Sequence, residues 1–445
     1  MQASQSKHGW TQLSDGYLSK TPIFQFIVVS LIFPLWGCAA SLNDILITQF
    51  KTVFSLNDAS TAFVQSAFYG GYFLIAIPAS LVIKKNTYKF AIMTGLIFYI
   101  IGCALFFPAS QVATYSMFLV AIFAIAIGLS FLETSCDTYS SMLGPKKYST
   151  IRLNISQTLV PLGDIAGILL GKYLIFGKVG NLSDKMAGMH GAERIAYGEK
   201  MLQMTLRPYK YILIVLVVML IILAVTPMPR SKATNQDAEK AVEEKPSLGE
   251  SIKYLLTNGR FMKGVGAQFV YAGMQTTVWS FTIRLALNLM NISDSAASTF
   301  MVWSYVAWFV GKLVANSFMS RFSSTGVLTW FSLCGFITLV ITFTVPNATA
   351  VYAAIATSFF FGPEWPTIYS HTLDTITEKK YTETGGALIV MSLIGGAIIP
   401  FIQGVVSDMT GSMQFSFVVP AICFAIITGY FWSEHRIDAK AGALK

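Results

Sequence analysis

The chain has 445 residues, of which 54% are hydrophobic and only 12% are charged, and its mean hydropathy is +0.59. A soluble protein carries about 25% charged residues, so this composition excludes a chain whose whole surface faces water. The net charge of +9 is explained by Lys and Arg in the loops on one side of a membrane, and we expect no nucleic-acid partner.

Apolar stretches follow one another along the whole chain, and each is about as long as the roughly 20 residues that a helix needs to cross a bilayer. We expect each to be helical, because lipid offers no partner for backbone N–H and C=O groups. The sequence therefore predicts an all-α membrane protein with 12 transmembrane helices, at about 24–50, 60–83, 90–108, 113–138, 149–176, 208–228, 261–286, 296–319, 325–345, 348–373, 384–407 and 412–433.

A polar segment at 227–256 divides these spans six and six. It contains Ser-Lys-Ala-Thr-Asn-Gln-Asp-Ala-Glu-Lys without an apolar period, which is typical of a solvated linker. We predict an N-terminal six-helix bundle with its tail over 1–226, and a C-terminal six-helix bundle with its tail over 257–445. Two such halves suggest repeats with a binding site at their interface.

The distribution of basic residues predicts the orientation. About two thirds of the 31 Lys and Arg fall in the termini and in the loops on the same side as the termini, which the positive-inside rule assigns to the cytoplasm. The loop at about 177–207 lies on the other side and also carries several basic residues, which weakens the contrast. We expect a multi-pass protein of the cytoplasmic (inner) membrane with both termini cytoplasmic.

Asp44 is the first charged residue of the first span. An acid that faces lipid costs about 2.5–3.5 kcal/mol at a helix centre, so an isolated intramembrane carboxylate indicates function. Two interpretations stay open, a proton-binding group in a polar cavity and a side chain that reaches the outer headgroups. The apolar pattern continues beyond Asp44, which favours the first, and Asn43 adds a donor and acceptor that suit a hydroxylated ligand.

Glu133 is a second isolated acid, deep in the fourth span. An ion pair with a buried base is the alternative to function, but the apolar interior of the first five spans contains no Lys or Arg. An unpaired buried carboxyl favours its protonated form. It can then exchange a proton near neutral pH, as a proton-coupled carrier requires.

Polar and aromatic residues recur at helical spacing in three further spans. Asn154 and Gln157 open the fifth span on one face, and Gln268, Gln275 and Trp279 share one stripe of the seventh. Such stripes either join helices or contact a ligand, and both interpretations stay open. Trp279 and Trp365 are candidates for stacking on the apolar face of a sugar, with simple packing as the alternative.

Other ionisable residues lie in or near the spans, and their roles are open. His371 and Asp374 are three residues apart and either form a proton relay or lie solvated at the cytoplasmic end of the tenth span. Lys312 pairs either with an acid or with the C-terminal carbonyls of a helix. The others are Asp137, Asp164 and Glu364.

Signatures of other chemistry are missing from the sequence. It contains no P-loop, no H-E-x-x-H and no G-x-S-x-G, so we expect neither an enzyme nor direct ATP drive. The five cysteines fall in apolar segments without C-x-x-C spacing and predict small core residues, with no metal. We expect no cofactor, and a proton as the coupling ion.

Short strings through nearly the whole membrane portion resemble the L-fucose permease branch of the major facilitator superfamily, the sugar:proton symporters. Their joint order and spacing make the resemblance specific to this branch. The strings are Leu42-Asn43-Asp44-Ile45-Leu46, Gln65-Ser66-Ala67-Phe68-Tyr69, Gly71-Tyr72-Phe73, Leu132-Glu133-Thr134, Leu143-Gly144-Pro145, Arg152-Leu153-Asn154, Gln157-Thr158, Ala267-Gln268-Phe269, Gln275-Thr276, Trp279-Ser280, Ile283-Arg284, Pro366-Thr367-Ile368 and Ser407-Asp408.

The resemblance implies a cavity between two six-helix bundles that opens alternately to each side. It implies that Asp44 is the main proton carrier, and that Glu133 contacts sugar hydroxyls and takes part in coupling. The chain departs from the branch at Ala40-Ser41, at 135–139, at Val160 and at Trp365. These departures fall in or near the implied sugar site and leave the identity of the sugar open.

We therefore expect a monomeric proton-coupled symporter that imports a monosaccharide, L-fucose or a related hexose, by alternating access in the lipid bilayer. The expected substrate-binding residues are Asn43, Glu133, Asn154, Gln157, Gln268, Gln275, Trp279 and Trp365, and the proton-coupling residues are Asp44 and Glu133. Two alternatives are an exporter of drugs or metabolites from the same superfamily and a sugar sensor that does not transport.

Overall fold

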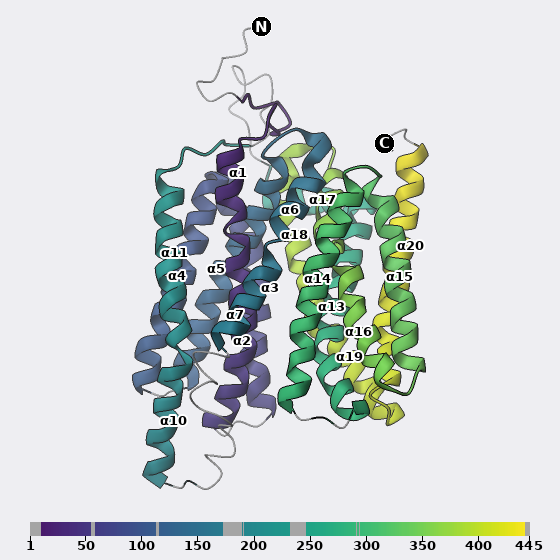
Figure 1. The fold of residues 1–445 in the computed structure, drawn as a ribbon. Coiled ribbons are helices and arrows are strands. Elements are labelled where there is room, and N and C mark those ends of the chain that lie inside the picture. Colours follow the sequence, from purple (N-terminus) through teal and green to yellow (C-terminus); the bar gives the residue numbers. More distant parts are fainter. Residues whose placement is uncertain are drawn as a thin grey trace. The chain divides into compact units, whose positions relative to one another are not determined.

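The structure is a computed structural model that describes residues 10–54, 58–112, 115–171, 189, 191–231, 246–290, 292 and 294–440. Almost all of this described chain is helical (Figure 1), and the bridge between Gln12 and Leu18 is isolated. The predicted all-α class is confirmed.

Each predicted span corresponds to one helix or to a broken pair of helices. In the first half these are α1 (Ile23–Ser30) with α2 (Phe33–Val53), α3 (Asp58–Lys85), α4 (Tyr88–Val112), α5 (Tyr115–Met142), α6 (Ser149–Gln157) with α7 (Val160–Gly171), and α11 (Arg207–Val225). In the second half they are α13 (Gly259–Met290), α14 (Asp294–Met319), α15 (Ser324–Thr344), α16 (Ala348–Phe361) with α17 (Glu364–Asp374), α18 (Thr382–Met391) with α19 (Gly395–Thr410), and α20 (Val418–Lys440).

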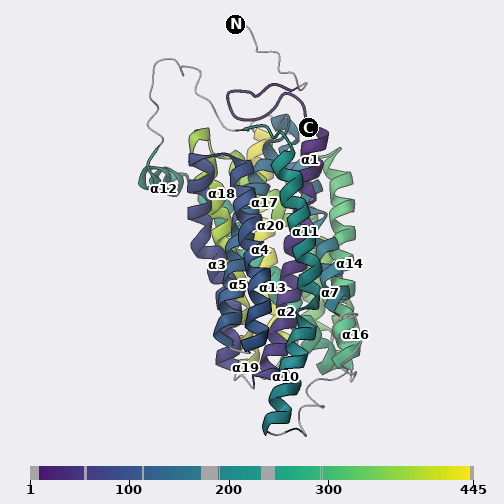
Figure 2. The same cartoon turned by 90° about the vertical axis from the view of Figure 1, so that its left-hand side faces the viewer.

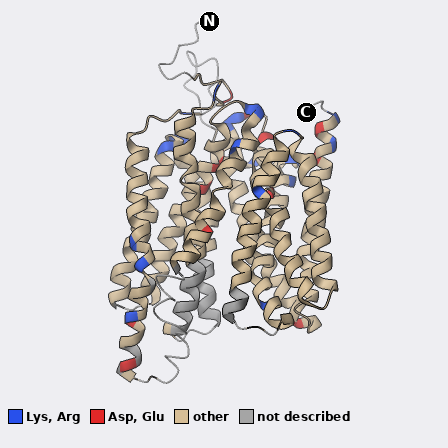
Figure 3. Ribbon diagram, viewed as in Figure 1, with Lys and Arg blue, Asp and Glu red and all other residues tan. Residues whose placement is uncertain are grey.

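The helix bodies are apolar, as a bilayer requires. Eight helical stretches of the described chain are long and apolar enough to cross a membrane by length and composition alone. Helices α13 and α14 are as long but carry more polar residues. Figure 3 shows that the bodies of the helices are mostly free of charge and that charged residues gather toward helix ends.

Three spans are broken where a proline lies just before the second helix of the pair or in its first turn. Pro34 is the second residue of α2, Pro161 is the second residue of α7, and Pro363 immediately precedes α17. Proline lacks the backbone N–H and its ring collides with the preceding turn, so it breaks a helix but is tolerated in a first turn. These breaks place α6 and α17, which carry candidate site residues, as short separate helices.

Two segments that the sequence assigned to loops contain helices. Helix α10 (Gly191–Thr205) lies in the predicted loop at 177–207, and its Met201 packs with Tyr197, Met204 and Val53. Helix α12 (Leu248–Thr257) occupies the end of the predicted linker, where Ser247 caps it by accepting a hydrogen bond from Glu250 N. Apolar packing stabilises α10 and the Ser247 cap stabilises α12, although the composition of both segments is polar enough to predict a loop. The rest of that linker, 232–245, lies outside the described residues.

The described chain forms two compact units. The first unit comprises the described residues of 1–22, 137–161 and 231–445, and the second comprises the described residues of 23–136 and 162–230. Both units thus draw on α5, which passes from the second to the first at Asp137. The boundaries that we predicted for the two six-helix bundles stay a prediction.

In the second unit, α4 packs along α11, α3 contacts α2 and α4, and α10 contacts α2 and α4 (Figures 1 and 2). Small residues make the close approaches possible. A Cβ added at Gly163 of α7 would lie 1.9 Å from Pro34 O, and one at Gly128 of α5 would lie 2.6 Å from Tyr99 N. Glycine is therefore required at both positions.

In the first unit, α13 is the central helix and packs against α16, α17, α19 and α20. Helix α15 packs between α16 and α20, and α6 packs on α14 and α17. The short helix α6, which belongs to the first half of the sequence, is thereby part of the same compact unit as the second half. This arrangement positions the polar residues described below.

Both ends of the described chain contact the last turns of α17. Tyr17 donates a hydrogen bond to Asp374 Oδ1 at 3.0 Å, and His371 Nε2 lies 3.2 Å from Asp438 Oδ2 near the end of α20. Burial, and then the Asp374 carboxylate, raises the pKa of the Tyr17 hydroxyl, which keeps it a donor. The two ends of the described chain therefore lie on the same side of the first unit.

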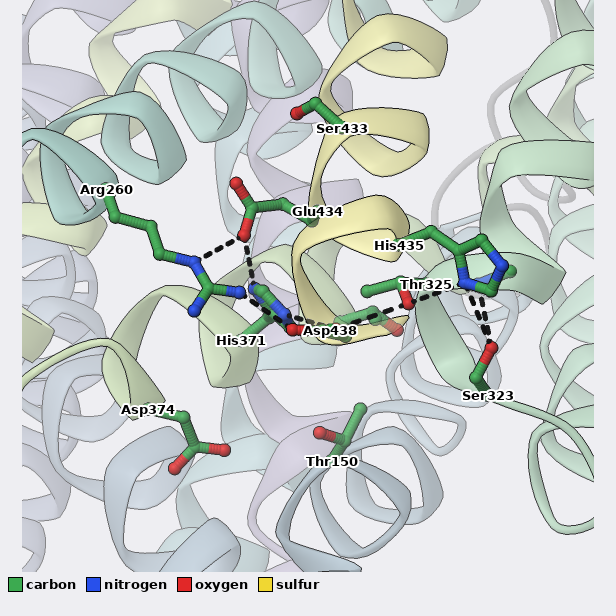
Figure 4. Close-up of polar contacts among 12 residues, drawn as sticks. Thr150, Arg260, Ser323, Thr325, His371, Asp374, Ser433, Glu434, His435 and Asp438 are labelled. Atoms are coloured by element: carbon green, nitrogen blue, oxygen red, sulfur yellow. Dashed lines mark hydrogen bonds and ion pairs between the residues drawn. The ribbon is translucent and has the colours of Figure 1, made fainter. Parts of the chain in front are cut away.

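The α20 end cluster consists of Arg260, Lys263, His371, Glu434 and Asp438. Figure 4 shows Arg260 between the two carboxylates, with Nε 2.7 Å from Glu434 Oε2 and Nη2 2.8 Å from Asp438 Oδ1. Lys263 Nζ lies 2.9 Å from Glu434 Oε1. His371 is half-buried in this cluster, and Asp374 has other partners, Tyr17 and Ser149. His371 and Asp374 thus have separate partners in the described chain. Both lie in the last turns of α17, as the second interpretation predicted, but each is only partly exposed.

Candidate substrate and proton site

Asn43 and Asp44 lie on α2, but their side chains fall outside the part of the chain that the structure describes. The preceding turn is described. Ser41 is buried and donates to the carbonyls of Gly37 and Cys38, at 3.2 Å each. A Cβ at Gly167 of α7 would lie 2.1 Å from Ser41 Oγ, so α7 packs closely here. The role of Asp44 stays a prediction.

Glu133 lies in the middle of α5 and is 7% exposed. The Tyr72 hydroxyl of α3 hydrogen-bonds its carboxylate, and Ser130 Oγ donates to Tyr72 O at 3.1 Å. Among the described residues, no Lys or Arg forms an ion pair with Glu133. A buried carboxyl whose partner is a neutral hydroxyl can take up a proton without breaking a salt bridge. The roles of Glu133 in proton coupling and sugar binding stay predictions.

The Gln157 cluster consists of Asp137, Asn154, Gln157, Lys312 and Asn316, all in the first unit. Gln157 is the last residue of α6 and joins two charged groups. Its Nε2 donates to Asp137 Oδ1 at 2.8 Å, and its carbonyl oxygen accepts from Lys312 Nζ at 2.8 Å. A single residue therefore bridges a buried carboxylate and a buried ammonium group.

Lys312 is 1% exposed on α14. Its ammonium group lies 4.2 Å from the centre of the Trp308 ring and contacts the carbonyl that ends α6. The negative end of a helix dipole and the face of an indole both stabilise a cation. Of the two partners that the sequence left open for Lys312, the helix C-terminal carbonyl is confirmed.

Asn154 connects α6 to α17. Its Nδ2 donates to Thr367 Oγ1 at 3.1 Å and to Thr150 O at 2.9 Å, while its buried Oδ1 has no hydrogen-bond partner in the described chain. Asn316 Nδ2 donates to Thr158 Oγ1 at 3.0 Å. A buried acceptor without a partner costs about 1–3 kcal/mol, so Asn154 has capacity for a hydroxyl donor.

The polar stripe of α13 is present. Gln268 is fully buried, and neither its Oε1 nor its Nε2 has a hydrogen-bond partner in the described chain. Gln275 is half-buried. Trp279 donates from Nε1 to Ser358 Oγ at 3.1 Å and packs on Trp308 with ring centres 5.0 Å apart. Through Trp308 the stripe reaches the Gln157 cluster.

Trp365 lies on α17 and is 6% exposed. Its ring stacks on Tyr369 with centres 5.1 Å apart and planes 12° apart, and the Tyr369 hydroxyl lies 2.8 Å from Thr138 Oγ1. One face of the indole is therefore already covered. The sequence analysis did not list Thr138, Thr367 or Tyr369 among the substrate-binding residues. Thr367 stood in the string Pro366-Thr367-Ile368, and Thr138 stood in the departure at 135–139.

Comparison with known proteins decides the family. Residues 23–400 match the sequence profile of the Major Facilitator Superfamily. The chain belongs to the Major Facilitator Superfamily. It is 32% identical over 415 residues to the L-fucose-proton symporter of Escherichia coli (strain K12), covering 93% of each chain, and 29% identical over 409 residues to the glucose/galactose transporter of Brucella abortus biovar 1 (strain 9-941), covering 92% of this chain and 93% of that one.

Solved structures give the same answer. The crystal structure of a Major Facilitator Superfamily transporter, FucP, in the outward conformation matches with a TM-score of 0.83 at 33% identity, covering 92% of this chain and 98% of that one. The resemblance to the L-fucose permease branch and the Major Facilitator Superfamily fold with 12 transmembrane helices are confirmed. The chain is a transporter of this superfamily and not an enzyme.

Proposed function

We propose that this Major Facilitator Superfamily protein is a proton-coupled symporter that imports a monosaccharide, L-fucose or a related hexose, by alternating access. The observation that carries the proposal is Glu133, a buried carboxyl with a tyrosine hydroxyl and no cationic partner among the described residues. Relatives that align along nearly the whole chain are named as L-fucose-proton symporters and glucose/galactose transporters. These names support both the proton coupling and the monosaccharide substrate of the proposal.

Asp44 is the main coupling group in this proposal. A carboxylate is costly to carry through a state closed to water on both sides, because low dielectric penalises its charge. Proton binding to Asp44 removes the charge and allows the closed state to form with sugar bound. Release of the sugar and the proton to the cytoplasm restores the charge and resets the carrier.

In this proposal, polar and aromatic side chains hold the sugar. Gln268 supplies a buried donor and acceptor, and Asn154 supplies a buried acceptor. Hydroxyls of a monosaccharide are both donors and acceptors, so they can satisfy each of these groups. Asn43, Glu133, Gln157 and Gln275 add further polar contacts, and Trp279 and Trp365 offer apolar ring faces.

The proposal also includes the oligomeric state, the membrane, the coupling ion and the orientation of the protein. The protein works as a monomer in the cytoplasmic (inner) membrane, needs no cofactor, and uses the proton as its coupling ion. Tyr17 and Asp438, near the two ends of the described chain, contact the same end of α17. That end carries Lys379 and Lys380 in the following turn, which by the positive-inside rule supports cytoplasmic termini.

Uptake by proteoliposomes tests the function. Labelled L-fucose, galactose, glucose and an amino sugar are offered with and without an imposed proton gradient, acidic outside. The proposal requires that at least one sugar accumulates above equilibrium and that a protonophore abolishes the accumulation. Accumulation that ignores the gradient, or no uptake and no counterflow of any sugar, would overturn it and favour the exporter or the sensor.

A further inference from the structure

Glu364 is a buried acid that the proposed mechanism does not use. It is the first residue of α17, directly after the break at Gly362-Pro363, and its exposure is 0%. It also resembles Glu133 in its place along the chain. Glu133 lies 13 residues before Lys146 and Glu364 lies 15 residues before Lys379, and each of these lysines begins a Lys-Lys-Tyr turn that precedes a helix, α6 or α18.

The side chain of Glu364 points into the first unit, toward α15 and α13. Its Oε1 lies 2.7 Å from Ser332 Oγ of α15, and its Oε2 is buried without a hydrogen-bond partner in the described chain. The residues before it pack on aromatic groups, since Phe361 contacts the fully buried Tyr271 of α13.

The titratable groups around Glu364 do not neutralise a carboxylate. Tyr271 of α13 is close enough to interact with it electrostatically but is uncharged near neutral pH. Lys312 of α14 passes beside Gly362 with its aliphatic Cγ and directs its ammonium group to Gln157 O. No ion pair of the described chain includes Glu364.

Hydrogen counting at Ser332 decides the protonation state. Ser332 Oγ lies 2.7 Å from Leu328 O and also 2.7 Å from Glu364 Oε1. A hydroxyl has one hydrogen, and a backbone carbonyl can only accept. Both contacts have the usual length of a full O–H···O hydrogen bond, and the Ser332 hydroxyl can fill only one of them as donor. A hydrogen on Glu364 accounts for the second contact, with Ser332 Oγ as its acceptor.

We propose that Glu364 is a proton-binding site in the second half of the chain, protonated in this conformation and donating its hydrogen to Ser332. The proton joins α17 to α15 and leaves no charge in an apolar region. Trp365 stacks on Tyr369 of the same helix, whereas Glu364 faces Ser332, so the site is separate from the candidate sugar contact. The inference rests on this geometry and does not depend on which substrate is carried.

Infrared spectroscopy of the purified full-length protein at neutral pH tests the proposal. A protonated carboxyl has a C=O band apart from that of a carboxylate, so Glu364→Gln should remove one component of this band. Glu378→Gln, at an exposed glutamate that pairs with Lys380, should leave the band unchanged. A spectrum of Glu364→Gln that retains the full protonated-carboxyl band would overturn the proposal.

Ser332→Ala provides the second measurement. A protonated Glu364 that loses its acceptor keeps its hydrogen, so its C=O band should shift to higher frequency without losing intensity.

The pH dependence of the melting temperature is the third measurement. Alkaline conditions remove the proton from Glu364 and with it the hydrogen bond between α17 and α15, whereas Glu364→Gln keeps a neutral donor. The fall in melting temperature from neutral to alkaline pH should therefore be smaller in Glu364→Gln than in wild type. An equal fall in both, or no shift of the band in Ser332→Ala, would contradict the proton assignment.

Discussion

The ammonium group of Lys312 lies 2.8 Å from the carbonyl oxygen of Gln157, and the side chain of the same Gln157 donates to Asp137 at 2.8 Å. A lysine of α14 is therefore connected through one residue of α6 to an acid near the end of α5. The connection belongs to one compact unit, although its members come from both halves of the sequence. This connection explains how the buried ammonium group of Lys312 is stabilised within an otherwise apolar span.

Lys312→Met should destabilise the protein. The substitution keeps the length of the side chain but removes the donor to Gln157 O and leaves Asp137 with less positive charge nearby, for a cost of about 1–3 kcal/mol. The measurement is thermal unfolding in detergent, with Lys380→Met at a half-exposed lysine as the control. Equal melting temperatures for the two variants would show that the Lys312 contact contributes nothing to stability.

The helices were predictable because a chain segment in lipid must satisfy its own backbone hydrogen bonds. Apolar length predicts every span. The breaks at Pro161 and Pro363 were not predicted, although the effect of proline on a helix explains them. Helix α10 was missed because its apolar residues, such as Met201, are few and its composition is mixed. A short helix of mixed composition has too little continuous apolar length to be predicted as a span.

The candidate site was only partly predictable for a physical reason. Asn154 and Gln157 could be placed on one helical face, but their partners Thr367 and Lys312 are more than 150 residues away. Tertiary contacts of this kind leave no local pattern. The Lys-Lys-Tyr turns at 146–148 and 379–381 were visible, but a match of three residues is too short to establish a repeat before both are seen as turns before a helix.

Asp44→Asn should abolish accumulation of sugar against its gradient while sugar exchange is retained. Asparagine resembles the protonated acid in shape and cannot ionise, so the carrier still closes around sugar but no longer binds a proton. Proteoliposomes with an imposed pH step measure accumulation, and counterflow measures exchange. Asp408→Asn, at an exposed aspartate in the last turn of α19, is the control and should behave as wild type. Undiminished accumulation by Asp44→Asn would remove Asp44 from the coupling mechanism.

Trp365→Ala should weaken sugar binding, and Trp365→Phe should weaken it less. Alanine removes both the ring proposed to face the sugar and the stack on Tyr369, which is worth about 0.5–1.5 kcal/mol, whereas phenylalanine retains a ring in the same place. Equilibrium binding of the sugar found in the uptake panel is the measurement. Trp330→Ala, at a tryptophan that is 69% exposed on α15, controls for loss of an aromatic residue. The same affinity in Trp365→Ala and wild type would place Trp365 outside the sugar site.

Glu133→Ala should weaken sugar binding about 10- to 100-fold, because a hydrogen bond to a charged group contributes about 1.5–3 kcal/mol. Glu133→Gln keeps an acceptor for the Tyr72 hydroxyl and a partner for sugar hydroxyls, so it should bind sugar more tightly than Glu133→Ala. It lacks the titratable proton, however, and its binding should lose any dependence on pH that comes from Glu133. Calorimetry in detergent at two pH values measures both effects. Affinity unchanged in Glu133→Ala would remove Glu133 from the sugar site, and an unchanged pH dependence in Glu133→Gln would remove it from proton coupling.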